Sequence, residues 1–183
     1  MKLTKTALFL MFLPMAFAEQ PETKQKIAKG EMELPELGTI AKMVKDSQNF
    51  SILKAAVEAA GIAETFEGKG PFTVFAPTDE AFNKLDKETL DALMLPANKE
   101  KLRSLLLYHV VAGTRPAASL KDEKITSMNG EDIEVDVDDG KVEIEDDANV
   151  VNADLMASNG VIHVIDKVIV PESLDGFEGL DED

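Results

Sequence analysis

Residues 70–82 read GPFTVFAPTDEAF and decide the start of the fold. The β-branched and aromatic residues 72–76, with a proline on each side, predict a short strand. Thr78 directly follows and is a preferred helix-capping residue, while Asp79 and Glu80 place negative charge at the positive end of a helix dipole. The stretch therefore predicts a strand that leads straight into a helix.

Helical periodicity surrounds this stretch up to residue 108. Apolar residues recur at helical spacing, and Gly61, Pro96 and their neighbours interrupt the pattern. The expected helices cover the region around Ile40, Met43 and Val44, residues 50–60 ending at Gly61, a turn at 62–66, and residues 88–95 and 99–107.

Beyond residue 108 the pattern alternates as in strands. Residues 133–137 and 142–144 alternate apolar and acidic side chains around the turn dipeptide Asp139-Gly140, which predicts a hairpin with one acidic face. Residues 150–153 suggest a further strand, and the nearly continuous apolar run 161–170 predicts a buried closing strand. Helices first and strands later, with one early strand, indicate an α+β domain.

Three segments together resemble the fasciclin-like (fasciclin I-type) domain family. They are residues 70–82, residues 105–113 (LLLYHVVAG) and residues 159–171 (NGVIHVIDKVIVP), each present once and in the family's order. The resemblance implies one domain at 37–171, built as a twisted β-wedge flanked by a layer of helices. It also implies a non-catalytic adhesion module that binds a cell surface or a protein.

The N-terminal residues have the pattern of an export signal. Lys2 and Lys5 precede an apolar run, and Ala18 ends a small-x-small pattern, so residues 1–18 are expected to be removed after Ala18. Residues 19–36 are expected to form a disordered lead-in and residues 172–183 an acidic tail. The chain has no cysteine, which fits a secreted or periplasmic bacterial protein and a fold held by its core alone.

The formal net charge of −16 argues against nucleic acid as a partner, because the chain would repel phosphates. No cofactor is expected. No permanent membrane span is expected either, since the apolar N-terminal run is too short to cross a bilayer. The expected partner is an unidentified protein or cell-surface component, and the oligomeric state stays open. An alternative function is a periplasmic binding protein for a small apolar ligand, which would need a pocket between helices and sheet.

The resemblance marks Tyr108 and His109, with Leu107 and Val110 beside them, as the interaction candidates. A second interpretation is that this pair is buried, with its hydroxyl and imidazole satisfied by neighbouring backbone, because an apolar flank is typical of a core. Under that interpretation we expect His109 to bond to the corner formed by Thr78 and Asp79.

The third segment contributes Asn159, Gly160 and His163 to the structural motif. Alternation places His163 on one face with Val161 and Ile165, which favours a core position over a metal ligand. Two histidines without acid or cysteine at ligand spacing give no case for a zinc site.

The acidic hairpin partly matches the ligand pattern of a calcium loop. Glu134, Asp136, Asp138 and Glu145 match positions one, three, five and twelve of an EF-hand loop, but Asp139 stands where glycine is needed and Gly140 comes one residue late. We therefore interpret these acids as a solvated strand face, with weak binding of divalent ions left open.

Catalysis by a nucleophile has little support. Ser104 and Ser158 each lie five residues before a histidine, and this spacing does not place a serine hydroxyl beside an imidazole with an acid behind it. The sequence also has no Gly-x-Ser-x-Gly motif. Asn49 begins a glycosylation sequon, but a role as the cap of the helix near residue 50 is the preferred interpretation.

Overall fold

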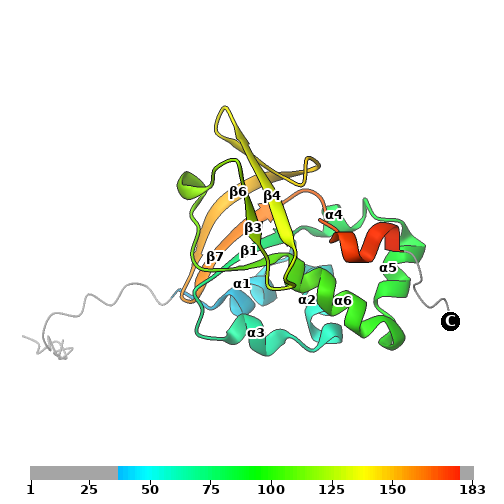
Figure 1. Cartoon of the computed structure of the whole chain (residues 1–183). Coiled ribbons are helices and arrows are strands. Elements are labelled where there is room, and N and C mark those ends of the chain that lie inside the picture. Colours follow the sequence, from blue (N-terminus) through cyan, green and yellow to red (C-terminus); the bar gives the residue numbers. More distant parts are fainter. Residues whose placement is uncertain (1–36, 178–183) are drawn as a thin grey trace, which may run out of the picture. The chain divides into compact units, whose positions relative to one another are not determined.

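The computed structural model describes residues 37–177 (Figure 1). The predicted signal peptide with its cleavage after Ala18, the lead-in 19–36 and residues 178–183 of the predicted tail lie outside the described residues. Residues 172–177, the first half of that tail, form a 3-10 helix, and Leu174 packs against the core. Ordered structure therefore extends past Pro171.

The predicted helices are confirmed, each with an apolar stripe toward the interior. They are α1 (Ile40–Asp46), α2 (Ser51–Ala60), α3 (Ala63–Glu67), α4 (Asp79–Phe82), α5 (Lys87–Leu93) and α6 (Lys99–Tyr108), with 3-10 turns η1 (Pro96–Asn98), η2 (Ala117–Ser119) and η3 (Glu172–Phe177). α2 ends at Gly61, whose left-handed φ of 68° suits a residue without a side chain. Within residues 37–177, none of the helices combines the length and apolar character of a membrane span.

The strands of the described region form a seven-stranded sheet. They are β1 (Phe72–Pro77), β2 (Val110–Ala112), β3 (Glu123–Thr126), β4 (Asp132–Asp138), β5 (Lys141–Ile144), β6 (Ala148–Ala157) and β7 (Gly160–Ile165), in the order β2-β1-β7-β6-β5-β4-β3. β1 runs parallel to β7, and the other neighbours are antiparallel. A bridge between Val111 and Ser127 brings the two ends of this order together, so the sheet is strongly curled.

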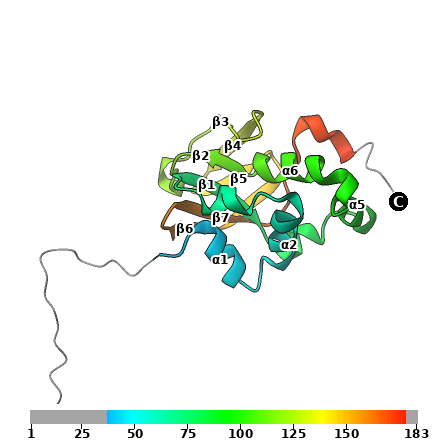
Figure 2. The same cartoon turned by 90° about the horizontal axis from the view of Figure 1, so that it is seen from below.

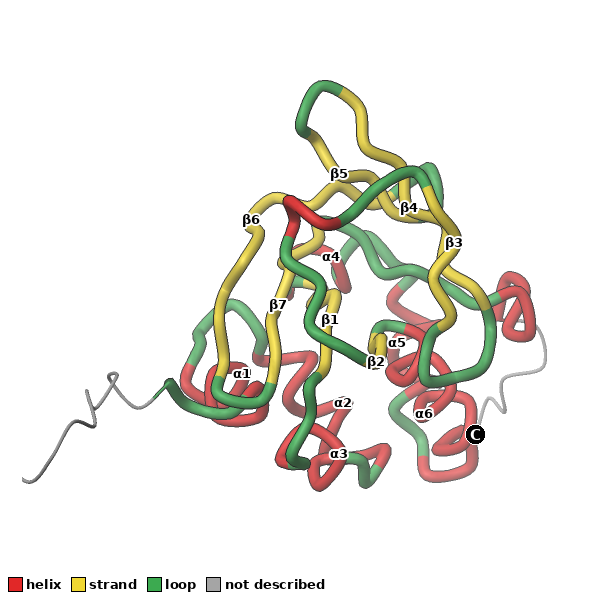
Figure 3. The backbone as a smooth tube through the Cα atoms, turned by 60° about the vertical axis from the view of Figure 1, so that its left-hand side comes forward, coloured by secondary structure: helices red, strands yellow, loops and turns green. Residues whose placement is uncertain are grey.

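Two hydrophobic cores follow from the alternation of β1 and β7. Val74 of β1 and Ile162 of β7 face the first core, which includes buried side chains of α1 to α6. Phe75 and Ile165 face the second core, which lies inside the curl and includes the apolar face of the predicted hairpin. Figure 2 shows the helices beside β1 and β7, and Figure 3 shows the β4–β5 hairpin far from α1, α2 and α3. The predicted α+β fold is confirmed.

The closing strand is shorter than predicted, because β7 ends at Ile165 instead of residue 170. Asp166 makes the last pairing contacts: its backbone N–H donates to the Asn149 carbonyl at 3.1 Å, and its carboxylate accepts from the Asn149 N–H at 2.8 Å. Val168 and Ile169 are still buried, although they lie outside any strand. Their apolar character therefore reflects burial in the core and not continued pairing.

Candidate functional site

The predicted interaction residues lie at the C-terminal end of α6 and the start of β2. Tyr108, His109 and Val110 are 2%, 3% and 1% exposed, and Leu107 is half-buried against the helical core. Three of these four side chains therefore belong to the interior and present no surface to a partner. Their burial favours the second interpretation, in which Tyr108 and His109 are structural residues of the core.

Tyr108 joins α6 to the acidic hairpin. Its hydroxyl lies 2.7 Å from the Glu145 carboxylate and 3.0 Å from the Asp132 carbonyl, and the same Glu145 oxygen accepts from the Glu134 N–H at 2.8 Å. Burial, followed by the bond to Glu145, raises the pKa of Tyr108 far above that of an ordinary phenol. The side chain therefore stays neutral and acts as a fixed link.

His109 uses both ring nitrogens on backbone groups. The Ile169 N–H donates to Nε2 at 3.2 Å, so Nδ1 carries the proton and donates to the Leu105 carbonyl at 2.8 Å. The expected bond to the corner of Thr78 and Asp79 is wrong, because these two backbone groups already satisfy the ring. Burial lowers the pKa of His109 to about 4, although the bond to Leu105 opposes that shift.

Thr78 and Asp79 cap two different helices. The Thr78 hydroxyl accepts from the Ala81 N–H at 3.2 Å, as expected for the cap of α4. The Asp79 carboxylate instead accepts from the first amides of α2, from Ser51 at 3.2 Å and from Ile52 at 2.8 Å.

The capping role predicted for Asn49 is wrong. Phe50 is the residue at the cap position of α2 and makes no side-chain bond there, while Asp79 supplies the acceptors from 27 residues away. Asn49 bonds to Asp79 through its carbonyl, which accepts from the Asp79 N–H at 2.9 Å. A cap supplied from a distant segment leaves no local signal in the sequence.

Asn159 connects the β6–β7 turn to the helices. Its side-chain oxygen accepts from the Ile40 N–H, and its amide donates to the carbonyls of Phe66 and Gly68, each at 2.8 Å. Gly160 follows and packs directly against the Phe72 carbonyl of β1, so that a Cβ at this position would overlap it. The pair fixes the start of the parallel pairing between β1 and β7.

His163 is fully buried and also satisfied on both nitrogens. The Asp154 N–H donates to Nδ1 at 3.3 Å, so Nε2 donates to the Arg115 carbonyl at 2.8 Å. The ring stacks on Phe75 with 5.7 Å between the centroids. The expected core position of His163 is confirmed, and its polar contacts hold a loop.

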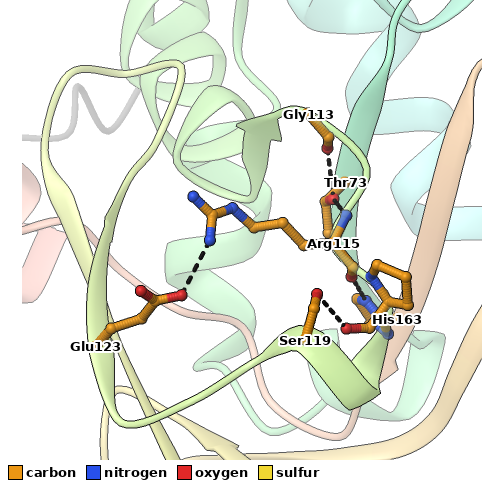
Figure 4. A network of polar contacts seen from close by, with 7 residues as sticks. Thr73, Gly113, Arg115, Ser119, Glu123 and His163 are labelled. Carbon is orange, nitrogen blue, oxygen red and sulfur yellow. Dashed lines mark hydrogen bonds and ion pairs between the residues drawn. The ribbon is translucent and has the colours of Figure 1, made fainter.

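Residues 113–122 form the loop between β2 and β3, called the 113–122 loop below. Figure 4 shows its first part gathered around two buried side chains of the sheet, Thr73 and His163. The Thr73 hydroxyl donates to the Gly113 carbonyl at 2.7 Å and accepts from the Arg115 N–H at 2.9 Å. The Arg115 guanidinium extends outward to the Glu123 carboxylate at 2.9 Å, an exposed ion pair that adds little stability.

The second part of the 113–122 loop is held from β6 and from the second core. The Ala117 N–H donates to the Asp154 carboxylate at 2.8 Å, and Leu120 is buried. Ala118, which lies between the anchors Ala117 and Leu120, and Lys121, which follows Leu120, are exposed. Sequence analysis did not identify this loop, although two polar residues in apolar strands, Thr73 and His163, were a signal that buried partners had to exist.

The acids of the tested calcium pattern do not assemble around an ion site. Glu134, Asp136 and Asp138 lie on β4, and Glu145 is engaged by Tyr108. Among residues 37–177, no group of three or more acidic or histidine side chains is arranged to hold a metal ion. Weak surface binding of divalent ions stays an open alternative.

In the structure of residues 37–177, neither Ser104 nor Ser158 has a histidine available as a general base. Ser104 is on α6, and Ser158 lies in the β6–β7 turn. Both ring nitrogens of His109 and of His163 bond to backbone groups. In the described part of the chain, neither histidine is therefore positioned to take a proton from a serine.

Comparison with known proteins agrees with this fold. The sequence pattern described as Fasciclin domain matches residues 48–171. Protein sll1483 of Synechocystis sp. is 43% identical over 164 residues, which cover 89% of this chain and 91% of that protein. The ig-h3 protein induced by transforming growth factor-beta in Sus scrofa is 35% identical over 156 residues, covering 82% of this chain but 22% of that protein.

Two further proteins extend the comparison to human and insect. Human periostin is 31% identical over 142 residues, covering 76% of this chain and 17% of periostin. The solved structure of a FAS1 domain pair from the insect cell adhesion molecule fasciclin I matches with a TM-score of 0.67 at 18% identity, covering 75% of this chain and 52% of that one. The chain thus spans only about a fifth of the ig-h3 and periostin relatives and about half of the insect pair.

Proposed function

This chain belongs to the fasciclin domain family, and on that premise we propose that it is an exported, non-catalytic interaction module that uses the 113–122 loop as its contact surface. The family supports the general role, because the insect protein with this fold is a cell adhesion molecule. The signal pattern at residues 1–18 supports export to the periplasm or the medium. The partner is a protein or another component of a cell surface.

One observation carries the choice of surface: the 113–122 loop has exposed residues but is held in place by polar groups of the sheet, two of which, Thr73 and His163, are buried. Thr73, His163 and Asp154 together bond to Gly113, Arg115 and Ala117 of the loop. Loops on rigid scaffolds commonly carry binding residues, and a loop ordered before binding loses less conformational entropy in a complex. Such a loop is suited to contact without needing a reactive group.

Tyr108 and His109 belong to the framework of the domain and not to this surface. Tyr108 fixes the acidic hairpin, and His109 fixes the chain around Ile169, so the end of α6 acts as an internal clamp. We assign them a structural role in the fold. Because both imidazole rings are committed to backbone groups, the arrangement favours a module without catalysis.

The test is a binding measurement with matched double variants of the full chain. Ala118→Glu with Lys121→Glu changes two exposed loop residues, and Ala59→Glu with Lys69→Glu makes the same chemical change at exposed positions outside the loop. Immobilised protein is exposed to the solubilised cell envelope of the source organism, and bound components are quantified.

The loop variant should lose most of the specific capture, and the control variant should retain it. Far-UV circular dichroism checks that both variants are folded. Equal capture by both variants would assign the contact to another surface. Absence of any specific partner for the unmodified protein would contradict the interaction role itself.

A further inference from the structure

A cavity of about 570 Å³ lies among α1, α2 and α3, away from the 113–122 loop. Its floor is apolar and nearly buried, formed by Val44 of α1, Leu53 and Val57 of α2, and Phe66 of α3. The volume is within the range of about 300–1,000 Å³ that is typical of small-molecule sites. A pocket between helices and sheet was the expectation for a small apolar ligand, whereas this one lies within the helical layer.

The rim of the cavity carries three lysines. Lys42 and Lys45 extend from α1 and Lys54 from the first half of α2, each directly following an apolar lining residue in the sequence. Lys42 is paired with Asp46 at 3.3 Å. Lys45 and Lys54 make no ion pair or side-chain hydrogen bond with any residue between 37 and 177.

Two carboxylates also line the rim, Glu58 on α2 and Glu67 on α3. Glu58 lies one turn after Lys54, so the positive charges belong to α1 and the first half of α2, and the negative charges to the C-terminal halves of α2 and α3. A chain with a net charge of −16 thus places three cations around its apolar cavity. Charge and apolar area in this combination fit an amphiphile with an anionic head.

We propose that this cavity binds a free fatty acid, with the alkyl chain on the floor of Val44, Leu53, Val57 and Phe66 and the carboxylate between Lys45 and Lys54. The apolar floor provides affinity that rises about fourfold for each methylene removed from water, until the cavity is full. Lysine ammonium groups on flexible stems bind a carboxylate at the mouth while their heads stay hydrated. This site goes beyond the proposed interaction role and is independent of the 113–122 loop.

Calorimetric titration of the delipidated full chain tests the site with three probes. Dodecanoate carries both features, dodecanol carries the alkyl chain without the charge, and butanoate carries the charge with a short chain. We expect one dodecanoate per chain, weaker binding of dodecanol and no measurable binding of butanoate. Anionic phospholipid vesicles form a fourth arm, which distinguishes a lipid headgroup from a free fatty acid.

Matched variants locate the site. Lys45→Gln with Lys54→Gln should weaken dodecanoate binding at least tenfold and leave dodecanol binding unchanged. Lys69→Gln with Lys87→Gln removes the same charge from exposed positions that do not line the cavity and should leave both unchanged. Ala41→Phe, at the cavity wall, should block both ligands by occupying the space.

Four results would overturn the proposal. They are no dodecanoate binding below its micellar concentration, equal binding by the Lys45/Lys54 variant, binding of dodecanol in preference to dodecanoate, and binding to phospholipid vesicles without binding of the free acid. Because the loop variants and the cavity variants change different residues, failure of this site leaves the proposed interaction role untouched, and the reverse also holds.

Discussion

Acidification should destabilise this domain through His109. The folded chain holds the ring neutral, with the Ile169 N–H aimed at Nε2, so a second ring proton would meet a donor instead of an acceptor. Burial lowers the pKa of His109 from 6.5 to about 4. The unfolded chain therefore takes up a proton as the pH falls below about 6.5, while the folded chain does not.

The size of the effect follows from this difference in pKa. Each pKa unit corresponds to about 1.4 kcal/mol, so His109 alone removes about 3 kcal/mol of unfolding free energy between pH 6.5 and pH 4. The stabilising contribution is complete above pH 6.5, and it decreases no further below pH 4. A loss of this size is a large part of the roughly 5–15 kcal/mol that holds an ordinary domain together.

Urea unfolding at several pH values between 7 and 4, followed by circular dichroism, measures the effect. The reference is His109→Gln, which cannot titrate and which should be less stable than the native chain at pH 7 by about 1–3 kcal/mol, because one buried backbone group loses its partner. Acidic groups titrate alike in both proteins, so the difference between the two pH profiles isolates His109.

Between pH 7 and pH 4 the stability difference should therefore shift by about 3 kcal/mol in favour of His109→Gln, so that the advantage of the native chain disappears or reverses. Parallel pH profiles for the native chain and His109→Gln would refute the reasoning. They would mean that His109 has the same proton affinity in the folded and unfolded chain, which is incompatible with its buried, backbone-bonded position.

Three further predictions concern other residues of the same framework. Tyr108 is the sole tyrosine of the chain, so absorbance at 295 nm should not show phenol ionisation near pH 10 and should rise only when circular dichroism reports unfolding; ionisation near pH 10 in the folded protein would contradict its assignment. Asn159→Ala should lower the unfolding free energy by about 3 kcal/mol or more in urea titrations, because it leaves three backbone groups without partners. The control Ser158→Ala, at the exposed neighbouring position, should change the unfolding free energy by less than about 0.5 kcal/mol. Gly160→Ala should cost more than about 3 kcal/mol in the same assay, because its Cβ must force β7 away from the Phe72 carbonyl, and a near-neutral effect would show that the close approach is absent.

Local features of the fold were predictable from the sequence because their causes are local. The cap at Thr78, the left-handed end of α2 at Gly61 and the turn at Asp139-Gly140 depend on neighbouring residues only. The alternation around His163 likewise separated the two sides of β7: Ile162 and Val164 face the first core, and Ile165 faces the second. The family resemblance then supplied the arrangement of these elements, which periodicity alone does not determine.

The partners of the polar residues were predictable only in part. The buried character of Tyr108 and His109 follows from their apolar flank, but the contact of His109 with Ile169 joins residues 60 positions apart. Asp79 caps α2 instead of its own helix for the same reason, because a carboxylate can reach any helix start that the fold brings near it. Pairing partners of this kind depend on how the strands and helices pack.

The candidate sites depended on packing to an even greater degree. The 113–122 loop has no motif of its own, and its order comes from Thr73, Asp154 and His163 on three different strands. The cavity likewise uses ordinary lysines and apolar residues of α1, α2 and α3. Both sites exist only once the elements are packed, so composition and spacing could not reveal them.

The contact surface can be located directly by hydrogen exchange, measured by mass spectrometry on the chain alone and bound to its cell-envelope partner. The account predicts slower amide exchange on binding within residues 113–122, with the buried segment around Tyr108 and His109 unchanged. Slower exchange confined to another face, with the 113–122 loop exchanging as in the free chain, would contradict it.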